Sequence, residues 1–157
     1  MTAQTSYEIK QQVAFAGALF ALHPHDIDSR DVETVAGINF GVAVSRGTDK
    51  DRQIVLGGDA AFFGITIRSL DREGAANTGV ILYKQKETAA LLRKGYIWLT
   101  CPAGCNPGDP VLYNDTTGII DAGTAGAGET QLNDAQWETT AAAGALAVVK
   151  LETTSNT

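Results

Sequence analysis

The sequence predicts an all-β protein, a jelly-roll-like β-sandwich or barrel with an extended N-terminal arm. Seventeen glycines in 157 residues supply the frequent turns that short strands need. Several segments alternate bulky apolar residues with small or polar ones, which is the period of a strand, and no segment shows a long 3.6-residue period. Short strands separated by turns roughly every eight to twelve residues are typical of sandwiches and barrels.

We assign residues 1–22 to the arm and residues 23–157 to a single β domain, a size that suits one domain. Apolar residues make up 44% of the chain and charged residues 19%, a balance that argues against disorder. The arm contains an apolar run, residues 13–22, but no positively charged region precedes it as in a signal peptide. A ten-residue helix spans about 15 Å, half of a bilayer core. We therefore expect a soluble protein, made in the cytoplasm, with no membrane partner.

The first strands follow a loop at residues 23–31 that is dense in turn-forming residues. Residues 38–45 alternate strictly and predict one strand with a bulky face. Residues 53–56 predict the returning strand of a hairpin, across a charged turn at residues 46–51. A third strand is expected at residues 62–68, where Phe, Ile and polar residues alternate.

The second half of the chain predicts more short strands. Residues 88–92 and 96–100 are expected to form a hairpin, joined through Gly95 in a left-handed conformation. Residues 121–131, rich in Gly, Ala and Thr, are expected to be an exposed loop. Residues 145–151 are apolar on both faces, so this last strand is expected to be central or covered. Further strands are predicted at residues 80–83, 111–113 and 119–120.

The net charge of −6 is unevenly distributed along the chain. Residues 1–94 hold eleven basic and eleven acidic side chains, whereas residues 95–157 hold seven acidic side chains and one basic one, Lys150. Nucleic-acid backbones attract clustered Lys and Arg. The acidic C-terminal part and the lack of a basic tract therefore predict no nucleic-acid partner.

Few residues offer catalytic or metal-binding chemistry. His23, His25 and Asp26 are close in sequence, but a metal site needs both rings to converge with a further ligand, and Pro24 restricts that geometry. No second histidine cluster and no Gly-x-Ser-x-Gly motif exist to support serine catalysis. We expect no enzyme and no metal site. A small hydrolase with two carboxylates across a cleft stays open as a third class of function.

Two further features have two interpretations each. Cys101 and Cys105, separated by three residues, could close a small disulfide loop or act as two small apolar residues at a strand end, which we favour. Tyr96, Trp98 and Tyr113 could mark a binding surface, since aromatic residues anchor interfaces. For Trp98, inside the strongest predicted strand, we favour a place in the core.

A series of strand and turn motifs runs along the chain, at residues 14–19, 26–29, 38–44, 63–68, 92–98, 108–113 and 145–149. The order of these motifs resembles the structural cement, or decoration, protein family of tailed phages. The likeness runs from about residue 13 to residue 152, although residues 19–22 and 121–131 depart from the pattern. It implies a jelly-roll-like fold on the outer surface of the virion head. It also implies a bridge between neighbouring major capsid protein subunits, homodimers or homotrimers of the cement protein, and no cofactor.

The apolar run of the arm is the candidate contact surface. We expect Phe15, Leu19 and Phe20 to anchor the protein to the capsid or to another subunit. The alternative, equally open, is that these side chains pack on the protein's own sheet. A second hypothesis for the whole protein is a phage-surface adhesion or glycan-binding module, because jelly rolls serve that use too and fold does not fix function.

Overall fold

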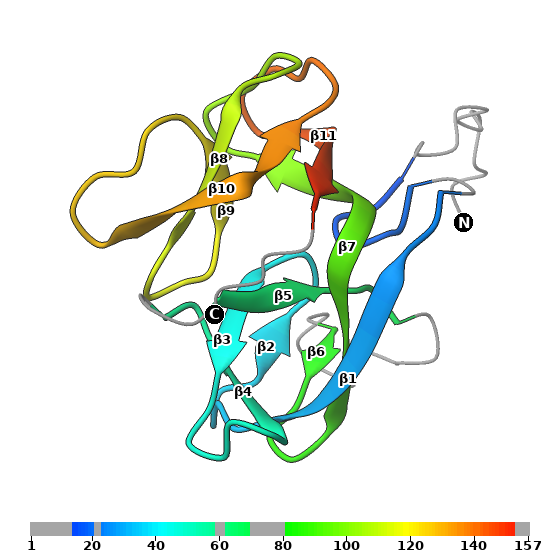
Figure 1. Cartoon of the computed structure of the whole chain (residues 1–157), viewed down its shortest axis with the longest axis vertical. Helices are drawn as coiled ribbons and strands as arrows, with labels where there is room; N and C mark the ends of the chain where they lie inside the picture. Colours follow the sequence, from blue (N-terminus) through cyan, green and yellow to red (C-terminus); the bar gives the residue numbers. More distant parts are fainter. Residues whose placement is uncertain (1–13, 21–22, 59–61, 70–80, 153–157) are drawn as a thin grey trace, which may run out of the picture.

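The computed structural model describes residues 14–20, 23–58, 62–69 and 81–152. Within these ranges the chain forms eleven β-strands and no helix (Figure 1). The strands are β1 (Asp26–Val32), β2 (Ile38–Asn39), β3 (Ala43–Arg46), β4 (Gln53–Leu56), β5 (Phe62–Thr66), β6 (Leu82–Tyr83), β7 (Thr88–Cys101), β8 (Pro110–Asn114), β9 (Ile120–Ala122), β10 (Glu129–Trp137) and β11 (Ala145–Leu151). The predicted all-β, jelly-roll-like fold is confirmed.

Five strands close into a barrel-like ring in the order β1-β4-β3-β5-β7, with β7 pairing back to β1. β1 and β4 run parallel, and the other pairs of the ring are antiparallel. Figure 1 shows the short pair β2–β6 between β3 and β4 on one side and β1 and β7 on the other. The apolar interior, which we call the barrel core, is formed by Val32, Ile38, Phe40, Val42, Val44, Ile54, Phe63, Tyr83, Ala89 and Leu91.

The second half of β7 begins another antiparallel layer, in the order β7-β11-β10-β8-β9. Figure 1 shows this layer above the barrel, with β7 running through both. Its apolar interior, which we call the upper core, surrounds the fully buried side chain of Trp137. The upper core is formed by Ala43, Phe62, Ile65, Ile67, Leu92, Ile97, Leu99, Cys101, Cys105, Val111, Tyr113, Ile120, Leu132, Trp137, Ala147, Val149 and Leu151. β11 pairs with β7 on one side and β10 on the other, which confirms that residues 145–151 form a central strand.

The predicted hairpin at residues 88–100 is wrong, because β7 is one continuous strand of 14 residues. The chain stays extended through residues 93–95, where Lys94 still pairs with Asp26 of β1. Gly95 has the expected positive φ, +132°, but it sits opposite Leu151 of β11 and reverses nothing. A strand that leaves one sheet and enters another needs a flexible residue where it bends. In the sequence, a glycine at such a point looks the same as a glycine in a turn.

The predicted strand at residues 38–45 is also wrong, because the chain splits it between β2 and β3. Gly41, at φ +71°, interrupts the extended backbone. The hydroxyl of Thr66 bonds to the backbone on both sides of this break. It donates to the carbonyl of Asn39 at 2.7 Å and accepts from the N–H of Val42 at 3.1 Å. Alternation alone does not distinguish one long strand from two short ones that bury the same face.

Two predicted loops contain strands. Residues 23–31 were expected to be a loop, but most of them belong to β1, which gains its hydrogen bonds from β4 and β7. Residues 121–131 were expected to be an exposed loop, but β9 ends at Ala122 and β10 begins at Glu129. β1 and β10 are polar in sequence and half-exposed. They form strands because neighbouring strands pair with them, and not because of a hydrophobic pattern.

Candidate functional site

The described part of the predicted arm, residues 14–20, lies along the second half of β7. The N–H of Gly17 donates to the carbonyl of Trp98 at 2.8 Å, and the N–H of Trp98 donates to the carbonyl of Ala18 at 2.8 Å. The N–H of Phe20 donates to the carbonyl of Tyr96 at 3.0 Å. These bonds give β7 a neighbour on the edge that β11 leaves open. Residues 14–20 are thus held by main-chain bonds, which fixes where their side chains point.

The three predicted contact residues lie in different surroundings. Phe15 is 46% exposed, and the guanidinium of Arg68 lies 4.5 Å from the centre of its ring. Leu19 is half-buried, packs against the upper core and forms a bridge with Ile97 of β7. Phe20 is half-buried on the outer side of β7. The structure therefore presents Phe15 to the surroundings and turns Leu19 toward the protein's own sheet.

Phe20 belongs to an aromatic cluster that we define as Phe20, His23, Tyr96 and Trp98. The centre of the Phe20 ring lies 5.5 Å from that of Trp98, edge-on, and 5.9 Å from that of His23, stacked. His23 lies 4.4 Å from Tyr96. Each member is partly or fully accessible, so the aromatic cluster forms part of the surface. Such rings offer large, rigid contact areas to a partner.

The core position that we favoured for Trp98 is wrong. Along β7, Ile97, Leu99 and Cys101 are buried, so the alternating residues 96 and 98 point outward. Trp137, in the missed strand β10, is the tryptophan of the core. Strand periodicity predicts that residues 97 and 98 face opposite sides, but it cannot say which side is covered.

The two histidines do not converge on one point. The ring of His23 faces Tyr96, while Nε2 of His25 lies 3.3 Å from the backbone carbonyl of Tyr96. Across the residues that the structure describes, no three His, Cys, Asp or Glu side chains gather as a metal site. No helix in the same ranges is long and apolar enough to cross a membrane.

Cys101 and Cys105 are free and buried, at the end of β7 and just after it. Burial, followed by the neighbouring Cys105 and Asp121, raises the pKa of the Cys101 thiol to about 12. Burial also raises the pKa of Cys105. Thiols that stay protonated are poor nucleophiles. The favoured interpretation, small apolar residues at a strand end, fits this geometry.

Comparison with known proteins identifies a family and solved structures of similar fold. The family described as Structural cement protein (E217 gp24/Pam3 gp6), a phage family, matches residues 3–152. The chain is similar to a protein in "The capsid of Myoviridae Phage XM1", with a TM-score of 0.72 at 19% identity, covering 96% of this chain and 97% of that one. At this identity the likeness concerns the fold.

A second solved structure is more distant, and no curated protein matches the chain. "The crystal structure of head fiber gp8.5 N base in bacteriophage phi29" has a TM-score of 0.44 at 8% identity, covering 82% of this chain and 95% of that one, too low to indicate a shared fold. The family match, over residues 3–152, includes every residue that the structure describes and therefore all eleven strands. The chain therefore belongs to the structural cement protein family of phages and has a cementing role in the phage capsid.

Proposed function

We propose that this protein sits on the outer surface of the head of a tailed phage and bridges neighbouring major capsid protein subunits. The family match over residues 3–152 carries the proposal. A protein that binds only the assembled shell stabilises it by about RT ln(1 + [L]/Kd) at each site, and many symmetric sites act together. This role needs a binding surface and no reaction, so the protein is structural and not an enzyme.

The contact surface that we propose consists of Phe15 and the aromatic cluster. Phe15 is an exposed aromatic side chain on a segment whose backbone is already fixed by β7. A fixed segment loses little conformational entropy when it binds, so its apolar contacts translate more fully into affinity. Phe20 adds an aromatic face, while Leu19 holds the segment on the protein's own core.

Homodimers or homotrimers are part of the proposal, because a bridge between subunits of a symmetric shell is made most simply by a symmetric oligomer. The mass of the purified protein in solution distinguishes monomer, dimer and trimer. A monomer in solution that is also a monomer on the shell would remove self-association from this account.

Heating shells tests the cementing role. Empty expanded shells are heated with and without the purified protein, and shell disruption is followed by light scattering and electron microscopy. We expect the midpoint of disruption to rise with protein concentration and then to saturate as sites fill. Serum albumin at equal concentration is the control. An unchanged midpoint at saturating occupancy would contradict cementing, and protein labelled on the inner face of the shell would contradict the outer location.

The aromatic cluster also favours a second candidate function, adhesion to host glycans. Sugars stack on exposed aromatic faces, and four rings lie together here. A glycan array probed with the isolated protein decides this point. Binding that is lost in Trp98→Ala but kept in Trp137→Phe, a change in the core, would support adhesion. An array without binding would remove it.

A further inference from the structure

Three arginines surround one phenylalanine at the barrel. The guanidinium carbons of Arg30, Arg46 and Arg93 lie 5.0, 4.7 and 4.7 Å from the centre of the Phe63 ring. The ring itself is buried, with 2% of its surface exposed, and the three arginines are half-buried. We call these residues the arginine trio.

The arginine trio occupies positions that face the barrel interior. Arg30 of β1 pairs opposite Ala89, and Arg46 of β3 pairs opposite Ile54; both partners belong to the barrel core. Residues directly opposite in an antiparallel pair share a face. Arg93 is the extra residue of β7 at the register shift between β1 and β7, and its guanidinium reaches the ring of Phe63, another member of the barrel core. Three strands thus each place a positively charged side chain beside the apolar residues of the barrel core.

Phe63 reaches the same place through an irregularity in β5. The register between β3 and β5 shifts between Val44 and Ser45, which pair with Gly64 and Phe62. Phe63 is the extra residue, and a bulge of this kind redirects a side chain. Phe62 consequently joins the upper core, while Phe63 joins the barrel core beneath the arginines.

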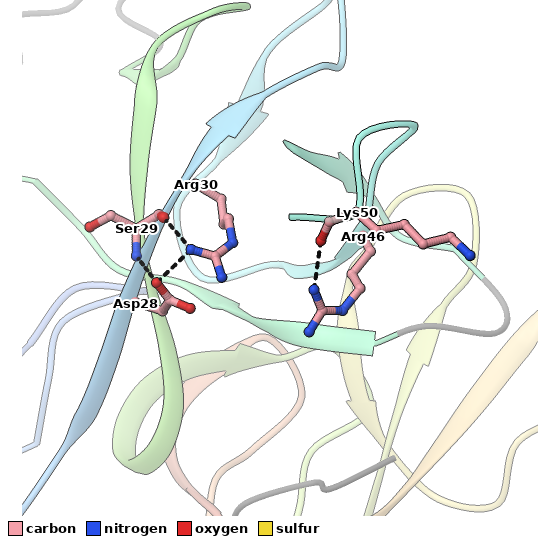
Figure 2. A network of polar contacts seen from close by, with 5 residues as sticks. All are labelled: Asp28, Ser29, Arg30, Arg46 and Lys50. Carbon is pink, nitrogen blue, oxygen red and sulfur yellow. Dashed lines mark hydrogen bonds and ion pairs between the residues drawn. The ribbon is translucent and has the colours of Figure 1, made fainter. Parts of the chain in front are cut away.

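The charges of the arginine trio are only partly balanced. Arg30 forms an ion pair with Asp28 at 2.8 Å and donates to the carbonyl of Ser29, while Arg46 donates to the carbonyl of Lys50 at 2.6 Å (Figure 2). Within the described part of the chain, neither Arg46 nor Arg93 pairs with a carboxylate. Counting the described residues alone, three cations and one anion leave two positive charges around one ring.

This arrangement is incomplete without an anion. All three guanidiniums lie within a Debye length of one another, about 10 Å at 0.1 M salt, so they repel each other. The face of Phe63 attracts each cation but leaves the positive charge unneutralised. In addition, the Nε–H of Arg30 is buried and has no hydrogen-bond partner among the described residues. A buried donor without an acceptor destabilises the folded state, and an incoming anion could supply the missing acceptor.

We infer that the arginine trio binds a carboxylate, supplied by an Asp or Glu side chain of the capsid protein. Guanidinium forks match the two oxygens of a carboxylate, and charge-assisted bonds of this kind are strong and directional. A protein partner is favoured over nucleic acid because the chain has no basic tract that could follow a phosphate backbone, whereas three guanidiniums around one ring suit a single carboxylate. The inference rests on the proposed function, since it assigns a chemistry to capsid binding.

The isolated protein tests the binding chemistry. The probe is a tetraglutamate peptide, and the readout is the rise in the thermal unfolding midpoint as peptide is added, which reports binding to the folded state. Wild type and Lys84→Gln, which removes an exposed cation elsewhere, are expected to respond equally. Arg46→Gln and Arg93→Gln are expected to respond at least tenfold more weakly. Arg30 is left intact because its removal would leave Asp28 without its ion-pair partner.

Each result of the peptide test has a defined meaning. If the arginines serve only to clamp Phe63, both variants unfold at lower temperature without peptide and bind the peptide as wild type does, which overturns the inference. If duplex DNA, but not the peptide, binds wild type and fails to bind the variants, the site recognises phosphate and the inference also fails. A peptide that does not bind wild type at low salt overturns it directly.

Shell binding separates this inference from the proposed function. We expect Arg46→Gln and Arg93→Gln to weaken binding to shells about tenfold and to make it less sensitive to salt, with Lys84→Gln unchanged. If wild type binds shells and both variants bind equally well, the inference fails and the proposed function stands. If wild type does not bind shells, the proposed function fails, and the peptide test still decides the chemistry of the arginine trio.

Discussion

The N–H of Gly17 donates to the carbonyl of Trp98 at 2.8 Å, and this bond joins the N-terminal segment to the longest strand of the fold. Gly17 has a φ of +83°, and a Cβ there would lie 3.0 Å from the backbone nitrogens of Arg68 and Gly41. The contact thus requires glycine. Because the segment is fixed in this way, side chains that bind a partner can be distinguished from side chains that stabilise the fold.

The first prediction separates Phe15 from Leu19. Phe15→Ala removes an exposed ring, so we expect the free energy of unfolding to change by less than about 1 kcal/mol. We also expect shell binding to weaken by about tenfold or more, as for an interface hot spot. Leu19→Ala removes a side chain packed on the core and is expected to cost about 1–3 kcal/mol of stability.

Urea unfolding and co-sedimentation with shells measure the two effects. Ile119→Ala is a matched control for Phe15→Ala, because Ile119 is exposed to a similar degree, 48%, and lies away from the segment. Normal shell binding by Phe15→Ala would remove Phe15 from the contact surface.

The second prediction compares two glycines with positive φ. Gly57 and Gly108 have φ values of +64° and +88°. A Cβ at Gly57 would overlap the carbonyl oxygen of Asp115, whereas a Cβ at Gly108 meets nothing within 4 Å. We expect Gly108→Ala to lower the free energy of unfolding by about 1 kcal/mol, because alanine is strained in the left-handed conformation. Gly57→Ala is expected to cost clearly more, and equal losses in chemical denaturation would show that crowding at Gly57 is relieved by small shifts.

The third prediction concerns the hydroxyl of Thr66, which is buried and bonds to Asn39 and Val42 at the break between β2 and β3. Thr66→Val keeps the shape and removes both bonds, so buried backbone groups lose a partner. We expect a loss of about 1–3 kcal/mol in the free energy of unfolding. Thr100→Val, at an exposed position of β7, is the control and is expected to be neutral or slightly stabilising. A neutral Thr66→Val would contradict this role for the hydroxyl.

The fourth prediction follows from the raised pKa of Cys101, about 12 in the folded protein against an ordinary value of 9.0. The folded state holds this proton more tightly than the unfolded chain does. Stability is therefore unaffected by this group below about pH 9 and falls as the pH rises from 9 toward 12. Cys101→Ala is expected to lose less stability than wild type over that window, as measured by urea unfolding at each pH.

Thiol labelling provides an independent check on the same pKa. At pH 8 the folded protein is expected to react slowly with an alkylating reagent, because the thiolate fraction is very small and both thiols are buried. Unfolding in urea is expected to restore ordinary reactivity. Fast labelling of Cys101 in the folded protein would contradict both the burial and the raised pKa.

The sequence by itself determined the fold class and several of its strands. Residues 53–56, 96–100 and 145–151 were identified because branched and aromatic residues, period-two alternation and flanking turns are local signals. The order of motifs along the chain also indicated the phage cement family, which the match to residues 3–152 confirms. The boundary between arm and domain at residue 22 stays a prediction, and residues 1–13 and 21–22 of that arm lie outside the described residues.

Tertiary structure alone decided which faces are covered and which distant residues meet. β1 reads as a polar loop, yet it is a strand because β4 and β7 supply its hydrogen bonds. Strand periodicity placed residues 97 and 98 on opposite faces, and only packing showed that Trp98 points outward. Arg30, Arg46 and Arg93 look like solvated charges in sequence and meet at Phe63 only when three strands close into a ring. Local preferences choose strands and turns, but pairing between strands far apart in the chain sets burial and brings charges together.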